Sequence, residues 1–187
     1  MITPAAEHYA RELDRLAPGA ARVTNKLPMN VAILGFFAAM FPRGRVVHCR
    51  RDPRDVGLSC YFRDFHAPTP YAVRPEWIGE YYRGYARLVG HWRDTFAKLS
   101  DPPGVVEVTY EEFVRDPEGG ARALVAGVGL AWDDACVAPV QDDRLEITQR
   151  ADQSGRGVYG SSVGRHEHYA AHTGVWRDLV APSFSDG

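Results

Sequence analysis

A guanidinium, a hydroxyl and a second guanidinium occur at Arg51, Ser59 and Arg63, and this combination suits a phosphate or a sulfate. Guanidinium groups make paired hydrogen bonds to such anions, and a hydroxyl adds a further donor. If residues 53–65 form a helix, Ser59 and Arg63 lie on the same face as Asp55, and Arg51 lies beside the first turn. The alternative is a solvated helix face rich in arginine, since arginines are common throughout this chain.

The sequence before this cluster predicts a strand that leads directly into the helix. Residues 45–49 (RVVHC) form a short, apolar and β-branched run that is typical of a buried parallel strand. Asp52 suits the N-cap of a helix, and Pro53 suits its first position. Ligands of open α/β sheets bind at the carboxyl ends of the strands, so we expect an anion to bind where this strand ends.

The order of strand, Arg51, helix start, Ser59 and Arg63 resembles the 3′-phosphate-binding segment of sulfotransferases that use 3′-phosphoadenosine 5′-phosphosulfate (PAPS). The resemblance extends to bacterial and tyrosylprotein-type members of that family. It continues, in the family's order, through residues 25–30 (NKLPMN), 81–93 (YYRGYARLVGHWR), 110–114 (YEEFV) and 159–169 (YGSSVGRHEHY). The resemblance as a whole covers roughly residues 5 to 180.

The resemblance implies that PAPS is the co-substrate. The residues that match the family's cofactor-binding positions are Arg51, Ser59, Arg63, Tyr110, Arg150, Arg156, Tyr159 and Arg165. By this resemblance the first three would hold the 3′-phosphate, while Tyr110 and the loop 150–159 would contact the adenosine part. The sequence departs from the family in that loop, because Arg150 replaces a hydroxyl that is said to touch the transferring group.

Lys26 is the residue expected to act in catalysis. It is one of two lysines among 22 basic residues, so a chain that otherwise uses arginine has a compact ammonium here. By resemblance, Lys26 would donate to the bridging oxygen as the adenosine bisphosphate leaves. Sulfuryl transfer needs such stabilisation of developing negative charge. The alternative is a lysine that caps or pairs on the surface.

The fold class predicted for the chain is α/β. Strands are expected near 22–24, 45–49 and 104–109, and the helices are expected over 4–17, 30–41, 53–65, 75–99 and 116–128, with a short helix near 135–137 and a last helix after residue 165. Strands that alternate with helices require a parallel sheet with helices on both faces. Nothing suggests a second domain, so residues 1–187 are expected to form a single one.

The family begins with a strand, a glycine-rich loop and a helix that bind the 5′-phosphosulfate through backbone amides. No such loop precedes Asn25, and neither 119–120 nor 155–157 follows a buried strand. We therefore expect the chain to be the carboxyl-terminal part of an incomplete three-layer P-loop-like fold. The missing strand would leave an orphaned sheet edge, which makes self-association possible. The acceptor's base is expected in the missing part.

The composition limits the classes of partner. A net charge of −2 and a pI near 6.4 argue against nucleic acid and membrane surfaces. Three cysteines without metal-ligand spacing, and histidines 166, 168 and 172 on an expected exposed helix, argue against a metal site. No secretory signal or membrane-spanning run is visible, so cytoplasmic residence is expected. The expected partner is a small-molecule, peptide or glycan hydroxyl acceptor.

Two hypotheses for the function remain. The first is a sulfotransferase that transfers a sulfuryl group from PAPS to a hydroxyl. The second is a noncatalytic nucleotide-binding remnant or interaction module, which the missing loop favours. A P-loop kinase is less consistent with the sequence, because the G-x-x-x-x-G-K-[ST] pattern is absent from it.

Overall fold

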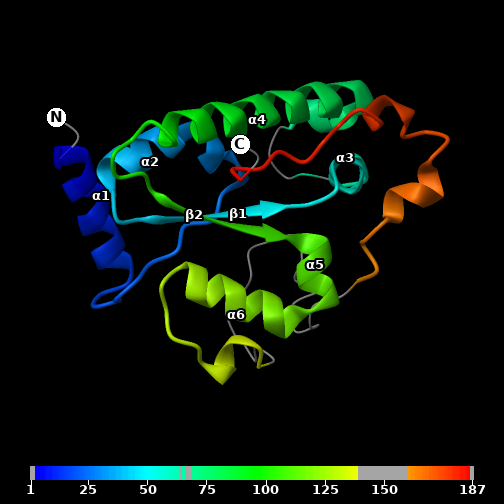
Figure 1. Ribbon diagram of the computed structural model, residues 1–187. Coiled ribbons are helices and arrows are strands. Elements are labelled where there is room, and N and C mark those ends of the chain that lie inside the picture. Colours follow the sequence, from blue (N-terminus) through cyan, green and yellow to red (C-terminus); the bar gives the residue numbers. More distant parts are fainter. Residues whose placement is uncertain (1–2, 64, 66–68, 139–159, 186–187) are drawn as a thin grey trace. The chain divides into compact units, whose positions relative to one another are not determined.

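A computed structural model describes residues 3–63, 65, 69–138 and 160–185 (Figure 1). The helices and strands are α1 (Thr3–Leu16), α2 (Leu34–Met40), β1 (Arg45–Arg50), α3 (Pro53–Tyr61), α4 (Pro75–Phe96), β2 (Gly104–Thr109), α5 (Tyr110–Arg115) and α6 (Pro117–Gly127). Short 3₁₀ turns are η1 (Pro28–Ile33), η2 (Pro70–Val73), η3 (Asp134–Cys136), η4 (Arg165–Tyr169) and η5 (Gly174–Trp176). The strands β1 and β2 pair and run in the same direction, so the α/β class and the parallel pairing are confirmed (Figure 1).

The chain divides into two compact units. The first comprises Met1–Val46, Arg83–Val105 and Pro182–Gly187, and the second comprises Val47–Tyr82 and Val106–Ala181. Both strands and α4 pass from one unit into the other. The single domain expected from the sequence stays a prediction.

The first unit is held together by aromatic packing on α2 and α4. The ring of Trp92 lies so close to Gly35 that a Cβ there would be 2.7 Å from it, and the Trp92 indole donates to the Val31 carbonyl at 2.6 Å. Phe96 stacks between Trp92 and Phe184, with centroid distances of 6.1 and 6.2 Å. Glycine at position 35 therefore lets the two helices approach closely.

The region from 22 to 41 differs from the prediction. Residues 22–24 are exposed and form no strand, because a strand needs a ladder with a neighbour and these three side chains gain too little burial to fix one. The helix expected over 30–41 is split into η1 and α2. Within α2, Leu34 is buried but Phe36 is 66% exposed.

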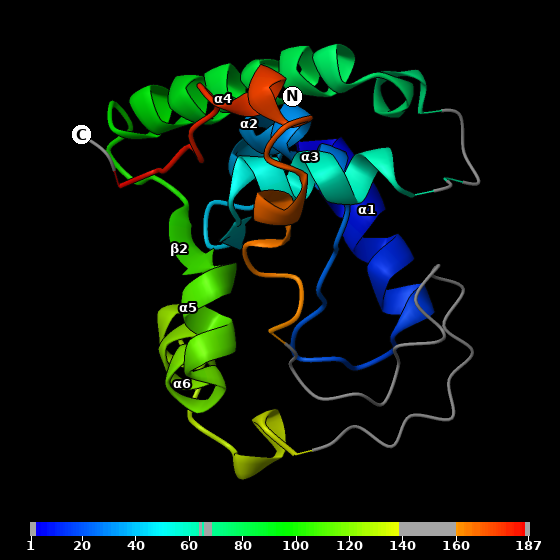
Figure 2. The same ribbon diagram turned by 90° about the vertical axis from the view of Figure 1, so that its right-hand side faces the viewer.

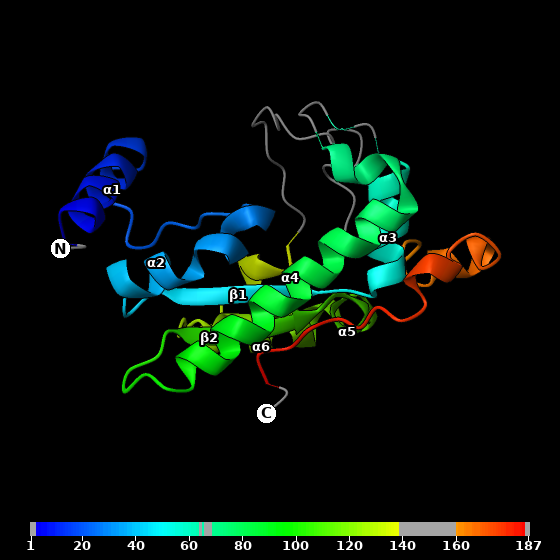
Figure 3. The ribbon, with the colours of Figure 1, turned by 90° about the horizontal axis from the view of Figure 1, so that it is seen from above.

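The second unit is built around α3, which contacts η2, η4 and η5. The indole of Trp176 is 1% exposed, lies against Gly57 and donates to the carbonyl of Pro75 at 2.8 Å. Figures 2 and 3 show η4, in orange, beside α3, in cyan. Helix α6 contacts α5 and packs on β2, where a Cβ at Gly127 would be 2.9 Å from Val106.

Two helices of the second unit are shorter than predicted. Helix α3 ends at Tyr61 rather than near residue 65, and the next ring, Phe62, packs 5.2 Å from Tyr169. This tertiary contact replaces a further helical turn. The expected last helix is instead the two turns η4 and η5. Gly164, with φ +68°, precedes η4, and Gly174 is the first residue of η5, so glycines disfavour one continuous helix here. The expected helix over 116–128 is confirmed as α6, and Gly129, with φ +74°, follows its end.

None of the described helices is both long enough and apolar enough to cross a lipid bilayer.

Candidate functional site

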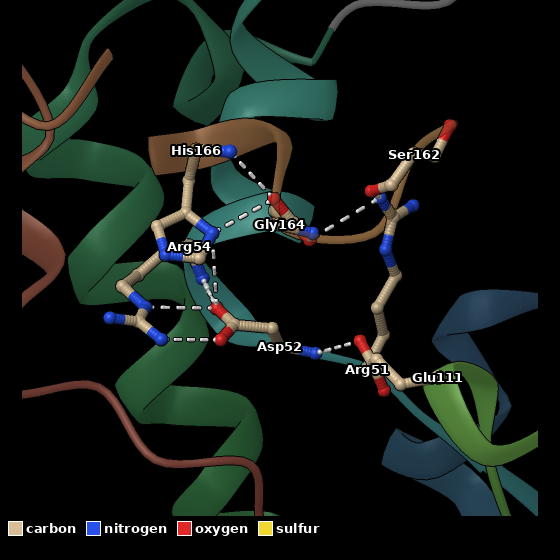
Figure 4. A network of polar contacts seen from close by, with 8 residues as sticks. Arg51, Asp52, Arg54, Glu111, Ser162, Gly164 and His166 are labelled. Carbon is tan, nitrogen blue, oxygen red and sulfur yellow. Dashed lines mark hydrogen bonds and ion pairs between the residues drawn. The ribbon is translucent and has the colours of Figure 1, made fainter. Parts of the chain in front are cut away.

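Arg51 is the first residue after β1, and its guanidinium lies among polar groups of three segments (Figure 4). Its Nη2 donates to the carbonyl oxygen of Ser162 at 2.5 Å and lies 3.9 Å from Oδ2 of Asp55. The guanidinium carbon is 4.8 Å from the centre of the Tyr110 ring. The side chain is 18% exposed, and its Nε is buried and has no hydrogen-bond partner among the residues that the structure describes. A largely buried cation therefore keeps one unused donor, which is costly unless an acceptor binds there.

Tyr110 is brought to Arg51 by the sheet. It directly follows β2, as Arg51 follows β1, and the carboxyl ends of paired parallel strands lie at the same edge. The ring face below a guanidinium is a favourable position for the cation. Two residues predicted for one site are thus in contact.

Asp52 fixes the turn between β1 and α3. Its Oδ1 accepts from the backbone N–H of Arg54 at 2.8 Å and from Arg54 Nε at 3.0 Å, while Oδ2 accepts from Nη2 at 2.6 Å. Its own N–H donates to Oε1 of Glu111 at 2.9 Å (Figure 4). Burial opposes ionisation of Asp52, but the hydrogen bonds from Arg54 outweigh it and hold the pKa of this carboxyl below its ordinary value. The predicted N-cap is confirmed, and it also joins α3 to α5.

Asp55 is the most buried charged residue of the site, at 1% exposure. Its carboxylate accepts from the backbone N–H groups of Gly164 and His166, both at 2.8 Å, and pairs with His166 Nδ1 at 2.9 Å. Because it also lies near Arg51, the carboxylate joins the first turn of α3 to the segment that contains Ser162 and Arg165. Residues 162–166 are therefore anchored beside Arg51.

The other predicted cofactor-binding residues have fewer contacts. Ser59 is half-buried on α3, one turn beyond Asp55, and its hydroxyl has no hydrogen-bond partner among the described residues. Arg63 lies beyond the end of α3, so the predicted helical spacing of Ser59 and Arg63 is wrong. Arg165 is exposed, with its guanidinium carbon 5.9 Å from the Phe62 ring. Three more predicted residues, Arg150, Arg156 and Tyr159, lie outside the described residues.

Lys26 belongs to the first unit. Its side chain is exposed and makes no hydrogen bond or ion pair with another residue that the structure describes. The preceding residue is fixed, since the Asn25 amide donates to the Tyr9 hydroxyl at 2.9 Å and accepts from Asn30 at 2.9 Å. The backbone next to Lys26 is thus held while its ammonium is free to bind a ligand.

Sequence reasoning missed the role of His166. It was expected on an exposed helix, but it is 7% exposed, and its Nδ1 lies 2.9 Å from Oδ1 of Asp55. Three histidines within seven residues were expected to share one exposed helix, and of these only His168 and His172 are exposed. What distinguishes His166 from the other two histidines is its contact with Asp55, which lies 111 positions earlier in the chain. A single sequence does not reveal such a pair.

One family model matches the whole region that contains Arg51 and Tyr110. A model described as "Sulfotransferase family" matches residues 2–134, which is more than half of the chain. The chain belongs to the sulfotransferase family. The stretch between Gly160 and Arg165, which also contacts Arg51, lies beyond the matched residues of this sulfotransferase-family chain.

Two curated relatives are similar to this sulfotransferase-family chain. An uncharacterised protein of Aquifex aeolicus (strain VF5) is 28% identical over 172 residues, which is 90% of this chain and 22% of the relative. A 3-beta-hydroxysteroid sulfotransferase of Cavia porcellus is 27% identical over 100 residues, which is 50% of this chain and 33% of the relative. The chain thus spans a third or less of the length of either relative. No solved structure matches it significantly.

Proposed function

We propose that this chain contributes the 3′-phosphate-binding part of an enzyme that transfers a sulfuryl group from PAPS to a hydroxyl acceptor. When bound, PAPS would supply the sulfuryl group and a leaving bisphosphate. The proposal includes the P-loop-like fold that membership of the family implies, of which β1 and β2 would be two strands.

The observation that carries the proposal is the unpaired Nε of Arg51. This buried guanidinium nitrogen has no acceptor within the described part of the chain, and it lies at the carboxyl end of a parallel strand, where α/β proteins bind phosphates. The hydroxyl of Ser59, which pairs with none of the residues in 3–63, 65, 69–138 and 160–185, lies on the helix that starts beside Arg51. The residues present therefore fit a phosphate group.

Each residue has a distinct part in this proposal. Arg51, Ser59 and Arg63 would bind the 3′-phosphate, and the Tyr110 ring would hold the Arg51 guanidinium while contacting the adenosine part. Arg165 and the residues of 150–159 would complete the cofactor site. Lys26 would stabilise the negative charge that develops on the leaving phosphate.

The second candidate is a nucleotide-binding protein without turnover. It is favoured by one observation, namely that none of the described strands leads into a glycine-rich phosphate-binding loop. Such a protein would bind adenosine 3′,5′-bisphosphate through Arg51 but would not transfer a sulfuryl group.

Calorimetry with adenosine 3′,5′-bisphosphate tests the binding part of the proposal. We expect measurable binding that Arg51→Ala weakens by at least tenfold, since loss of a charged hydrogen-bonding partner costs about 1.5–3 kcal/mol. The matched control is Arg15→Ala, which removes the same charge from an exposed ion pair with Glu12 on α1. Equal affinity in wild type and Arg51→Ala would remove the site assignment.

A further inference from the structure

The first two turns of α4 carry large apolar side chains on two different faces. Ile78 and Tyr82, four positions apart, are buried at 3% and 9% exposure. Trp77 and Tyr81, also four positions apart, lie on the neighbouring face and are 42% and 40% exposed. A helix with one face against a core usually carries polar residues elsewhere. Packing within the second unit therefore accounts for the first of these faces but not for the second.

We call the exposed surface formed by Val73, Arg74, Trp77, Glu80 and Tyr81 the α4 face. All five residues belong to the second unit, and all five are exposed. A contiguous exposed apolar patch rimmed by polar residues is typical of an interaction site. Tryptophan, tyrosine and arginine are also the residue types that are enriched where proteins bind one another. The composition of the α4 face thus indicates a protein partner.

The side chains of the α4 face are already held in position. The ring of Tyr81 stacks on that of Tyr71 in η2, with centroids 4.0 Å apart and planes 9° from parallel. The guanidinium carbon of Arg74 lies 5.1 Å from the centre of the Trp77 ring. The carbonyl of Arg74 accepts from the backbone N–H of Ile78 at 3.1 Å, which fixes Arg74 at the start of the helix. Docking therefore requires little further ordering of these groups.

The charges of the α4 face are arranged symmetrically about Trp77. Arg74 lies three positions before it and Glu80 three positions after it. Both are exposed, and neither forms an ion pair with another residue of the described chain. When two antiparallel copies of a helix pack about a two-fold axis, the residue three before the axis faces the residue three after it in the other copy. Arg74 of each copy would then face Glu80 of the partner subunit.

The apolar residues of the α4 face follow the same symmetry. Val73 lies four positions before Trp77, and Tyr81 lies four positions after it. In the antiparallel pair, Val73 would meet Tyr81 of the partner subunit, and the two Trp77 rings would meet at the axis, where aromatic pairs are favourable. The net charge of −2 adds little repulsion between two copies. The α4 face is thus complementary to itself both in charge and in apolar surface, as an interface between identical subunits requires.

We infer that the α4 face is a dimer interface, at which a second copy of this chain packs its own α4 in antiparallel orientation with the two-fold axis at Trp77. This inference goes beyond the proposed function and does not depend on it. Burial of the rings supplies most of the affinity, while the pairs of Arg74 and Glu80 set the orientation, since exposed ion pairs contribute little energy. Five residues are fewer than the roughly 20–30 a side of a standard interface, so we expect a weak, concentration-dependent dimer.

Sedimentation equilibrium of the whole chain, from micromolar to millimolar concentration, tests the inference. We expect a monomer–dimer equilibrium that Trp77→Ala weakens by at least about tenfold, because a central aromatic residue dominates such an interface. Phe36→Ala is the matched control. It removes an exposed aromatic ring of the first unit and should leave the dissociation constant unchanged.

Charge reversal tests the antiparallel arrangement separately from the apolar contact. Arg74→Glu and Glu80→Arg should each weaken the dimer by at least about fivefold, because like charges then face one another at both ends of the interface. In an equimolar mixture of these two variants, every facing pair again has opposite charges. The mixture should therefore form a heterodimer about as strong as the wild-type dimer. Both side chains are exposed, so both variants should keep the wild-type melting temperature.

Three results would overturn the inference. A monomer at every concentration would leave the α4 face to a different protein or to another part of this chain. A dimer that Trp77→Ala does not weaken would lie at another surface, such as the open edge of the sheet. Failure of the mixed charge variants to recover association would exclude the antiparallel arrangement about Trp77. Because the mixture uses only exposed charged positions, it remains decisive even where Trp77→Ala lowers the stability of the monomer.

Discussion

Asp55 and His166 are in direct contact although 111 positions separate them in the chain. The carboxylate accepts from the backbone N–H of His166 at 2.8 Å and pairs with its Nδ1 at 2.9 Å, and the two residues are 1% and 7% exposed. Gly164 adds a third donor at 2.8 Å. One carboxylate thus holds the segment that contacts Arg51, so the geometry of the proposed phosphate site depends on Asp55.

Asp55→Ala should lower the free energy of unfolding by about 3–5 kcal/mol, because loss of one partner of a buried, hydrogen-bonded group leaves its donors unpaired. Urea unfolding measures the change. The control is Asp94→Ala, which removes an exposed carboxylate paired with Arg93 and should cost at most about 1 kcal/mol. Similar losses in both variants would show that Asp55 does not anchor the segment.

The elements that could be predicted from the sequence are those with a strong local pattern. The strand β1, the N-cap at Asp52 and the helix α6 match their predictions because β-branched runs, capping residues and glycine stops act within a few positions. The prediction of a strand at 22–24 was wrong, because a run of three residues does not specify a partner strand. The prediction of a last helix after residue 165 was wrong, because glycines interrupt a region in which the spacing of the apolar residues alone suggested a helix.

In the candidate site, too, local features could be predicted from the sequence and long-range contacts could not. Arg51 and Tyr110 could be predicted to lie together, since each follows a strand and parallel strands end at one edge. The predicted face shared by Ser59 and Arg63 failed because the helix ends at Tyr61, where Phe62 packs on Tyr169. That contact joins residues more than 100 positions apart, and a local pattern contains no information about it.

Gly57→Ala should destabilise the protein by about 1–3 kcal/mol, since the new Cβ would lie 3.0 Å from two atoms of the buried Trp176 ring. Gly90→Ala is the matched control in α4. A Cβ at Gly90 meets no atom within 4 Å, so this change should stabilise by about 0.5–1 kcal/mol. Thermal melts of both variants measure the two changes in stability, which should have opposite signs. A stabilised Gly57→Ala would contradict the packing of α3 on Trp176.

Stability should fall in acid partly through Asp52. Its pKa in the folded protein lies below the ordinary value of 3.8, because the Arg54 hydrogen bonds outweigh burial. A carboxyl whose folded pKa is lowered contributes stability that is fully present above its unfolded pKa and is lost as the pH falls through the folded value. We therefore expect a decline that starts near pH 3.8 and continues below it.

The variant Asp52→Asn isolates this charge, because asparagine is also a good N-cap and can still accept from the backbone N–H of Arg54. Urea unfolding from about pH 5 downward should show a shallower acid decline for Asp52→Asn than for wild type. Identical slopes would show that the Asp52 and Arg54 pair adds no pH-dependent stability.

Lys26→Ala should separate catalysis from binding. The Lys26 ammonium is exposed and pairs with none of the described residues, so its removal should leave the melting temperature nearly unchanged. If it stabilises charge only as the sulfur–oxygen bond breaks, the variant should bind adenosine 3′,5′-bisphosphate as wild type does and should lower kcat. Arg51→Ala should instead lose most of the binding.

The size of the effect decides between the catalytic role of Lys26 and a surface role. Removal of one preorganised donor at a developing negative charge lowers kcat by about 10²–10³, or roughly 2.7–4 kcal/mol. Steady-state transfer from PAPS to 2-naphthol measures it, in a protein that includes any coding sequence preceding position 1 in the gene. Lys98→Ala, which removes the other lysine of this chain, is the control and should keep wild-type turnover. A wild-type kcat in Lys26→Ala would contradict the catalytic assignment, because stabilisation of the leaving phosphate is the one role that this proposal gives to the Lys26 ammonium.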